Sequence, residues 1–307
     1  MRISNNMLSR NLLLNLESSQ SRMVELQNQM SSGHRISKPS DDPVGIENAL
    51  RIKSSITMVN QWQNNVTEAL SYMNTTDSVL GDLTSLLQRT RELAIQGSNG
   101  TNSTNERNTI AEEVKQIINQ VKTLANTKVG NKYIFAGTNT DTEPMPASGA
   151  WVGNQKPIAF DVGNNIQLDV MVNGADLFIN SGSAYSLLSN SSPPSALPAT
   201  TGILDELYNQ LLSGNSATIN ATLDGLDQNI NSVTALRADL GARINRVESI
   251  QSQLSSMTYN LTSNLSGIED ADMAKTITDF TNQQNVYQSA LSVGAKIIQP
   301  SLIDFMR

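Results

Sequence analysis

The chain contains no cysteine in its 307 residues and only one histidine, His34. Without thiols it can form no disulfide bond, cysteine-ligated zinc site or thiol nucleophile. Without a second histidine, His34 would need other groups to converge on it before it could serve a metal site or acid–base catalysis. We therefore expect no metal, no cofactor and no catalytic site, and we expect that the protein is not an enzyme.

Aromatic residues, basic clusters and long apolar runs are also scarce. Aromatic side chains make up 4% of the residues, which is little for one thick globular core. The net charge is −7 and no lysine–arginine cluster occurs, so nucleic acid is not an expected partner. No run approaches the roughly 18–20 apolar residues of a membrane span, and the N-terminus lacks the pattern of a cleaved signal. We expect a soluble protein without membrane insertion.

What the sequence does contain is a pattern of apolar residues spaced alternately three and four apart. The longest stripe runs from Ile219 to Ile268 and is polar at three of its fifteen positions. A helix of that length measures roughly 75 Å and must lie along other long helices. Similar stripes cover 12–33, 69–94, 110–124 and 273–298.

The two terminal stripes are predicted to form an assembly seam in which marginal helices are completed by partner chains. Polar residues within the stripes, such as Ser19 and Gln284, would weaken the pairing and align it, as polar a positions do in coiled coils. The seam residues are Leu12, Leu16, Met23, Leu26, Met30, Met273, Ile277, Phe280, Tyr287, Leu291 and Ile298.

Between residues 137 and 200 the pattern changes to short alternating runs separated by turn residues. The runs "PIAFDV" (157–162), "NIQLDVMV" (165–172) and "ADLFI" (175–179) are typical of strands. The sequence therefore predicts a mainly α fold, an elongated antiparallel helical rod or coiled coil built from both chain ends, with a small inserted β-rich domain. The predicted domains are a terminal coiled-coil segment (1–42 plus 270–307), a helical rod (43–138 plus 202–269) and an inserted β-rich outer domain with its linker (139–201).

The stretch "SSGHRISKPSDDPVG" (31–45) is predicted to be a joint between two helices. Gly33 suits the position just after a helix, and Pro39 excludes a helix through the residue before it. Asp42 followed by Pro43 matches an N-cap with proline at the first helical position. Asp41 would add negative charge at the positive end of the helix dipole.

The stretch "IEDADMA" (268–274) is interpreted in the same way, as a helix break followed by a new cap. Asp270 and Asp272 are two residues apart and so fall on different helix faces, which is poor geometry for paired catalytic carboxylates. The alternatives are that these stretches contact a partner chain, or that they form a metal or catalytic site, for example in a hydrolase that uses His34 with Asp41 or Asp270. Trp62 and Trp151 are isolated and are interpreted as packing residues, not as a stacking platform.

Several stretches together resemble the bacterial flagellin family. "MSSGHRISKPSDDPVG" (30–45) and "NKYIFAGT" (131–138) are similar to its hook-associated branch. "LLQRTRELAIQGSNGT" (86–101), "LRADLGARINRVES" (236–249) and "SGIEDADMAK" (266–275) resemble flagellin-type helical regions. The resemblance covers both chain ends in the expected order, and the inserted segment matches poorly.

The resemblance implies a structural subunit of the flagellum: an adapter ring that joins hook to filament and templates filament growth. Its partners would be copies of itself, a neighbouring hook-associated protein on the hook side, flagellin on the filament side, and an export chaperone on the C-terminal segment. It would be exported unfolded through the flagellar type III channel to the extracellular hook–filament junction. Its terminal segments would be disordered in the monomer and ordered on assembly. A filament-forming flagellin and a signalling coiled coil are the alternatives.

Overall fold

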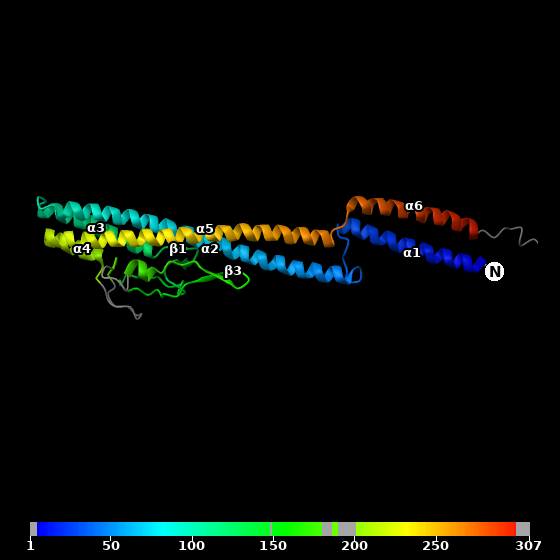
Figure 1. Ribbon diagram of the computed structural model, residues 1–307, viewed down its shortest axis with the longest axis horizontal. Helices are drawn as coiled ribbons and strands as arrows, with labels where there is room; N and C mark the ends of the chain where they lie inside the picture. Colours follow the sequence, from blue (N-terminus) through cyan, green and yellow to red (C-terminus); the bar gives the residue numbers. More distant parts are fainter. Residues whose placement is uncertain (1–4, 148, 180–185, 190–200, 299–307) are drawn as a thin grey trace, which may run out of the picture. The chain divides into compact units, whose positions relative to one another are not determined.

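The computed structural model of the chain describes residues 5–147, 149–179, 186–189 and 201–298 (Figure 1). Contacts between residues divide the chain into unit 1, formed by Met1–Met58 and Ser256–Arg307, and unit 2, formed by Val59–Ser255. Both ends of the chain therefore contribute to unit 1, and unit 2 is one continuous segment. The inserted segment belongs to the same unit as the helices that flank it in sequence.

The fold is mainly helical, as predicted, and its long helices come from both ends of the chain. The helices are α1 (Asn5–Ser32), α2 (Pro43–Ser98), α3 (Thr104–Ala125), α4 (Ile203–Ser213), α5 (Ser216–Glu269) and α6 (Met273–Ile298). The strands are β1 (Lys128–Val129), β2 (Lys132–Tyr133), β3 (Ala159–Gly163) and β4 (Ile166–Asp169), and they form two antiparallel pairs, β1–β2 and β3–β4. Within the described residues, no helix is both long enough and apolar enough to cross a membrane.

The parts of α2 and α5 that lie in unit 2 bury apolar residues at every seventh position. In α5 the buried positions are Ile219, Leu226, Val233, Leu240, Val247 and Leu254. In α2 the side chains of Val66, Met73, Leu80, Leu87 and Ala94 are completely buried. A seven-residue repeat keeps one face of a helix turned toward its neighbours, so the stripe seen in the sequence is the core of this unit.

Charged residues beside this core link α2 to α5. The Arg237 guanidinium donates from Nε to Asp77 at 2.8 Å, and Arg91 is paired with Asp227. Arg237 occupies a polar position in the predicted stripe. It is exposed, and it donates a second hydrogen bond from Nη2 to Asp77 at 3.1 Å. The hydrogen bond from Arg237 holds the pKa of the Asp77 carboxyl below its usual value.

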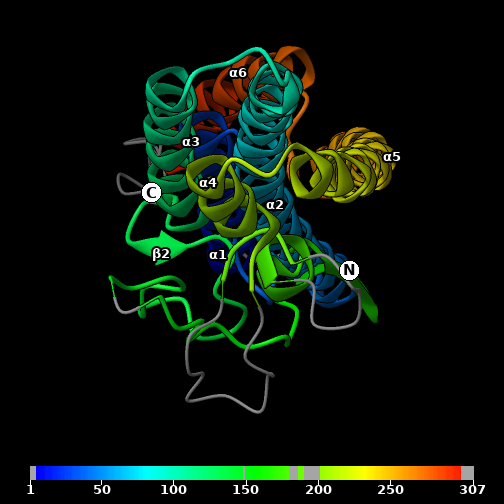
Figure 2. The same ribbon diagram turned by 90° about the vertical axis from the view of Figure 1, so that its left-hand side faces the viewer.

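Two shorter helices complete the helical part of unit 2. Helix α3 begins with a capping box, in which the Ser103 N–H donates to Glu106 at 2.7 Å and the Glu106 N–H donates to Ser103 Oγ. Helix α4 ends at Gly214, which has a φ of 75°. Figure 2 shows α3 and α4 side by side.

A small aromatic core joins the inserted segment to Phe135, which precedes it in the chain. Phe135, Trp151 and Phe178 are fully buried, and the Phe135 and Phe178 rings meet edge to face with centroids 5.2 Å apart. A side chain at Gly174 would collide with Phe135 and Trp151, so glycine permits this close packing. Trp151 is therefore a packing residue, as predicted.

The predicted strand at 175–179 is wrong, because Ala175–Ile179 form one turn of π-helix. Four of its five side chains are buried and Asp176 is exposed, whereas a half-buried strand would expose every second residue. Asn173 begins the turn by accepting the Ala175 N–H on its side chain. The other two predicted strands correspond to β3 and β4, and the hairpin β1–β2 was not foreseen. Of the predicted inserted domain and its linker (139–201), residues 148, 180–185 and 190–200 lie outside the described residues.

Candidate assembly site in unit 1

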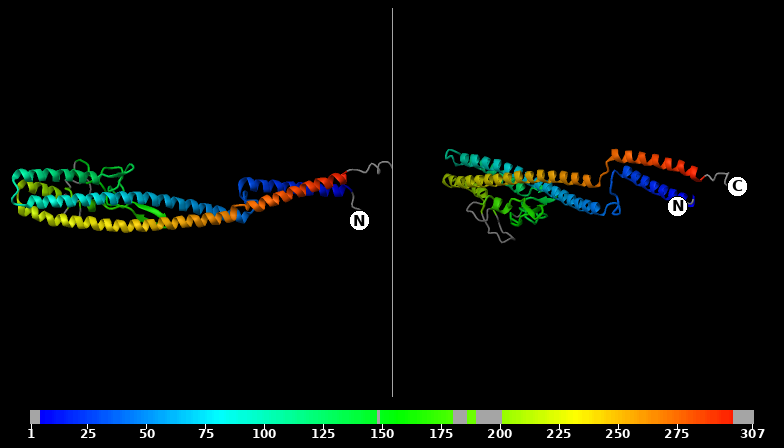
Figure 3. Two further views of the ribbon diagram at one scale, coloured as in Figure 1. Left: turned by 90° about the horizontal axis from the view of Figure 1, so that it is seen from above. Right: turned by 45° about the vertical axis from the view of Figure 1, so that its right-hand side comes forward.

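Helices α1 and α6 of unit 1 lie side by side, as both views in Figure 3 show. The face of α1 toward α6 carries Ser19, which is buried, between apolar residues that are half-buried. These apolar residues are the five α1 members of the predicted seam: Leu12, Leu16, Met23, Leu26 and Met30.

The predicted seam residues of α6 divide between two faces of the helix. Phe280 and Tyr287 are half-buried, whereas Met273, Ile277 and Leu291 are 40%, 47% and 46% exposed. The side chain of Ile298 lies outside the described residues. The shielded stripe of α6 is mostly small or polar and consists of Thr276, Phe280, Gln283, Tyr287, Ala290 and Gly294.

Small and polar residues let α1 and α6 approach closely. The Gln283 side chain donates from Nε2 to Ser19 Oγ at 2.7 Å across the interface. A Cβ at Gly294 would lie 2.6 Å from the nearest methyl carbon of Leu12, so the two helices touch at this position. The polar residue that aligns α1 with α6 is therefore Gln283. Gln284 is exposed in the single chain, and its role in pairing with partner chains stays a prediction.

The joint after α1 is built by local hydrogen bonds. Gly33 has a φ of 72° directly after α1, a left-handed conformation that favours glycine. Asp42 caps α2 by accepting the Gly45 N–H at 2.9 Å, and Pro43 is the first residue of the helix. Pro39 lies in the exposed turn between them.

Asp41 stabilises that turn and does not cap the helix. Its carboxylate accepts the Lys38 N–H at 2.8 Å and the Ser37 N–H at 3.1 Å. These two backbone hydrogen bonds, that from Lys38 first, lower the pKa of the Asp41 carboxyl. The prediction that Asp41 acts through the helix dipole missed this more direct role.

The second joint, between α5 and α6, pairs with the first. The Arg35 N–H donates to Glu269 O at 2.7 Å and the Ala271 N–H donates to Gly33 O at 2.8 Å, so the two connecting segments form an antiparallel bridge. The ring of His34 lies 3.1 Å from Asp270, measured from Nδ1 to Oδ1. Asp272 then caps α6 by accepting the Lys275 N–H at 3.1 Å.

Charged side chains that the sequence did not single out reinforce this bridge. The Glu269 side chain is only 11% exposed, and Lys53 donates to it from Nζ at 2.7 Å. Arg35 donates from Nη2 to Ile268 O at 2.8 Å, near the end of α5, where a cation is favourable. Lys53 and Glu269 are separated by 216 positions, and no local pattern links them.

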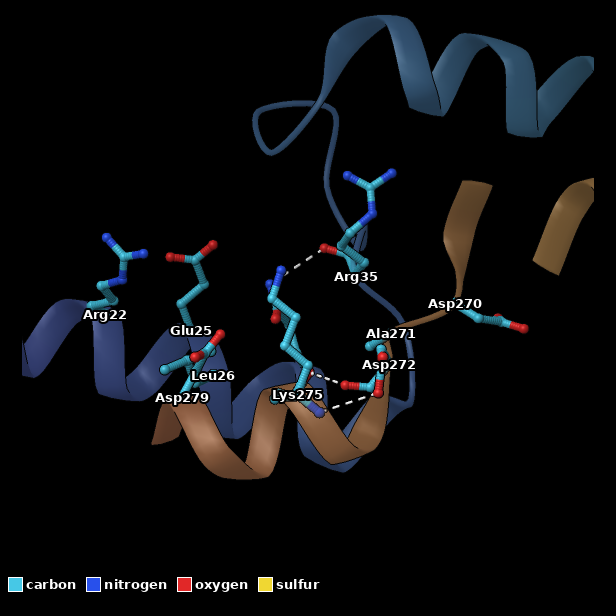
Figure 4. Close-up of a pocket in the computed structure, with 11 residues that line it drawn as sticks. Arg22, Glu25, Leu26, Arg35, Asp270, Ala271, Asp272, Lys275 and Asp279 are labelled. Carbon is cyan, nitrogen blue, oxygen red and sulfur yellow. Dashed lines mark hydrogen bonds between the residues drawn. The ribbon is translucent and has the colours of Figure 1, made fainter. Parts of the chain in front are cut away.

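Beside the joint, charged residues surround a hollow of about 400 Å³ between α1 and α6 (Figure 4). Its lining includes four carboxylates and three cations: Glu25, Asp270, Asp272, Asp279, Arg22, Arg35 and Lys275. Among the described residues, no group of three or more histidine, cysteine or acidic side chains is placed to hold a metal ion. The mixture of signs suits contact with a protein surface better than one small ion.

Comparison with known proteins places the chain in a family. The model for the bacterial flagellin N-terminal helical region matches residues 3–140, and that for the C-terminal helical region matches residues 223–306. A 30.7 kDa core protein of the flagellar filament of Treponema maltophilum is 31% identical over 87% of this chain and 85% of its own length. The chain belongs to the bacterial flagellin family.

Two further relatives are hook-associated proteins. Flagellar hook-associated protein 3 of Escherichia coli is 28% identical over 94% of this chain and 95% of its own length. In the crystal structure of hook-associated protein 3 from Legionella pneumophila, the similar region covers 71% of this chain and 98% of that chain, with a TM-score of 0.58 and 20% identity. The latter likeness establishes a common fold.

Proposed function

We propose that this chain is a structural subunit of the bacterial flagellum, an adapter that joins the hook to the filament and on which the filament grows. The observation that carries the proposal is the similarity to hook-associated protein 3 along 94% of the chain. The chain would act outside the cell, as a homo-oligomeric ring between a hook-side protein and flagellin. Before export, its C-terminal segment would be bound by a chaperone.

The apolar residues that unit 1 leaves exposed support a role in assembly. On α6 these include Ile277 and Leu291, and on α1 they include Leu13 and Leu14, which are 61% and 58% exposed. Large exposed apolar side chains on a hairpin commonly mark a protein–protein contact. We propose that neighbouring subunits cover this surface, and that the segments 1–42 and 270–307 become fully ordered only then.

The two paired joints would let the contact between neighbouring subunits transmit mechanical load. The bridge between Gly33–Arg35 and Glu269–Ala271 ties the inner ends of α1 and α6 together. A load applied to the α1–α6 hairpin would therefore pass to the start of α2 and the end of α5 at the same place. In this proposal 43–138 and 202–269 form the rod of the subunit, and 139–201 is its outer part.

The proposal is tested in a strain that lacks this gene, by electron microscopy of its flagella and by measurement of flagellin in the medium. We expect bare hooks and flagellin lost as monomer, with both defects corrected by the wild-type gene. Normal filaments on the hooks of the deletion strain would overturn the proposal.

Point variants examine the exposed surface of α6 in the same strain. Ile277→Glu combined with Leu291→Glu should leave the hooks bare, because two charges would enter the contact between subunits. Gln288→Glu places one charge on an exposed position of the same helix that is already polar, and it should restore filaments. Equal filament growth with both variants would show that the α6 surface is not the contact.

A filament-forming flagellin is the second candidate, favoured by the 31% identity to the Treponema maltophilum core protein. Purified protein that polymerises alone into long filaments would support this candidate. An adapter should stay monomeric under the same conditions.

A further inference from the structure

Trp62, on α2, lines a hollow of about 720 Å³ in unit 2. The remaining lining residues come from the β3–β4 hairpin: Asp161, Gly163, Asn164, Asn165 and Gln167. We refer to these six residues as the Trp62 hollow. Trp62 is half-buried, so it packs in part, as expected from the sequence, and also lines this hollow.

The hairpin that forms one side of the Trp62 hollow is attached to α2. The Asn65 side chain donates from Nδ2 to Asp161 O at 2.7 Å, and the Phe160 ring lies 6.2 Å from the Tyr72 ring between centroids. Asn165 holds the hairpin turn with a φ of 57°, a conformation that asparagine tolerates. Figure 1 shows the hairpin beside α2. The lining residues are therefore held in place without a ligand.

The polar groups of the Trp62 hollow are available to a ligand. In the described part of the chain, no hydrogen bond engages the side chains of Asn164, Asn165 or Gln167. Each of these amides offers both donors and an acceptor, and the Asp161 carboxylate adds acceptors. A ligand with many hydroxyl groups could satisfy all four side chains.

The charge of the lining narrows the class of ligand. Among the described residues, no lysine or arginine lines the Trp62 hollow, so these residues offer no cationic partner for a phosphate or a carboxylate. One aromatic ring is less than the cage of several rings that binds quaternary ammonium groups. The broad apolar face of an indole and several planar amides instead match a sugar ring, which presents C–H groups on its face and hydroxyls at its edge.

We propose that the Trp62 hollow binds a neutral carbohydrate, with one sugar ring lying on the indole of Trp62 and its hydroxyls bonded to Asn164, Asn165 and Gln167. The site is open on one side, so it would accept a unit of a longer glycan. This binding function is separate from the proposed junction role.

The test uses the full-length purified protein and three probes: maltoheptaose, cellohexaose and chitotetraose. Binding is followed by saturation-transfer NMR on the sugar and by tryptophan fluorescence. Trp151 is fully buried, so a change in emission reports Trp62. We expect saturable binding of at least one probe, with a dissociation constant on the order of 1 mM, as suits a shallow site.

Three variants identify the site. Trp62→Ala should weaken binding at least tenfold, and Trp62→Tyr should retain most of it because a stacking face remains. Asn60→Ala changes an exposed neighbour on α2 outside the Trp62 hollow and should bind as the wild type does. Circular dichroism establishes that each variant is folded.

The proposal would be overturned if no probe binds saturably at concentrations about tenfold above that dissociation constant, or if Trp62→Ala binds as well as the wild type. Choline that binds more tightly than the sugars would also overturn it, in favour of a cation site. The carbohydrate could come from a glycan linked to a protein or from a polysaccharide, and a glycoprotein assayed before and after removal of its glycans distinguishes them. A Trp62-dependent loss of binding on removal indicates protein-linked glycan. Binding of the free sugars alone indicates polysaccharide.

Discussion

The helical core of unit 2 and the α1–α6 hairpin of unit 1 use the same three-and-four spacing with opposite results. In unit 2 the α2 residues Met73, Leu80 and Leu87 are completely buried. In the hairpin the buried residues are small or polar, such as Ser19 and Thr276, and apolar side chains such as Ile277 face outward. Unit 2 thus contains a closed apolar core, whereas the hairpin leaves large apolar side chains exposed.

The first prediction tests this difference with matched truncations. Leu87→Ala should destabilise unit 2 by about 2–5 kcal/mol, because it leaves a cavity in a closed core. Leu16→Ala, in the half-buried face of α1, should cost about 1 kcal/mol or less, since less apolar area is lost. Urea unfolding of the full chain, with amide exchange in α1 and α3, measures both costs. Equal costs would remove the distinction between the two regions.

The second prediction concerns the buried carboxylate of the joint. Glu269→Ala should cost roughly 1.5 kcal/mol, because Lys53 loses its partner and the Gly33–Ala271 bridge loses support. Amide exchange of Arg35 and Ala271 should become faster. Glu47→Ala is the control, since Glu47 is 78% exposed and pairs with Arg51 within one helix. If Glu47→Ala had the same effect on these amides, Glu269 would have no special role.

The third prediction separates the two apolar stripes of α6. Gln283→Ala should cost about 0.5–1 kcal/mol through loss of the hydrogen bond to Ser19 and should speed amide exchange in α6. Gln284→Ala changes the next residue, which is exposed, and should leave exchange unchanged. If Gln284→Ala speeded exchange and Gln283→Ala did not, the face of α6 that meets α1 would be the one predicted from the sequence.

The smallest expected effect is that of the ion pair between Asp77 and Arg237. The hydrogen bond from Arg237 lowers the pKa of the Asp77 carboxyl, so the pair stabilises the fold above the carboxyl's ordinary pKa of about 3.9. Asp77→Asn should cost about 0.5 kcal/mol at pH 7, because both partners are partly exposed.

That cost should disappear as the pH falls through the lowered pKa of Asp77, where the wild-type carboxyl also becomes neutral. Urea unfolding of both proteins between pH 7 and pH 2 measures the difference. A difference that stays constant down to pH 2 would show that the charge of Asp77 contributes nothing.

Local chemistry explains most of what could be read from the sequence. The long stripes predicted the helices because burial of one helix face requires that spacing whatever its partner. The ends of α1 and the start of α2 follow from Gly33, Asp42 and Pro43, since a left-handed glycine and a capped N-terminus act over a few residues. For the same reason Asp272 at the start of α6 could be read as a cap.

Some local signals were ambiguous. The run at 175–179 has the composition of a strand. It forms a helical turn instead, and the burial of that turn on more than one side depends on Phe135 and Trp151. In α6 two overlapping stripes share Phe280 and Tyr287, so the spacing fits both faces equally well.

What the sequence by itself determined is therefore the set of long helices, their caps and the family to which the chain belongs. Only the tertiary structure decided which stripe of α6 meets α1, that Lys53 reaches Glu269, and that Trp62 lies open beside the β3–β4 hairpin. Caps and periodicity depend on neighbours within a few residues. Contacts between distant positions, such as Lys53 and Glu269, which are 216 positions apart, depend on how whole helices pack. No local pattern encodes that packing.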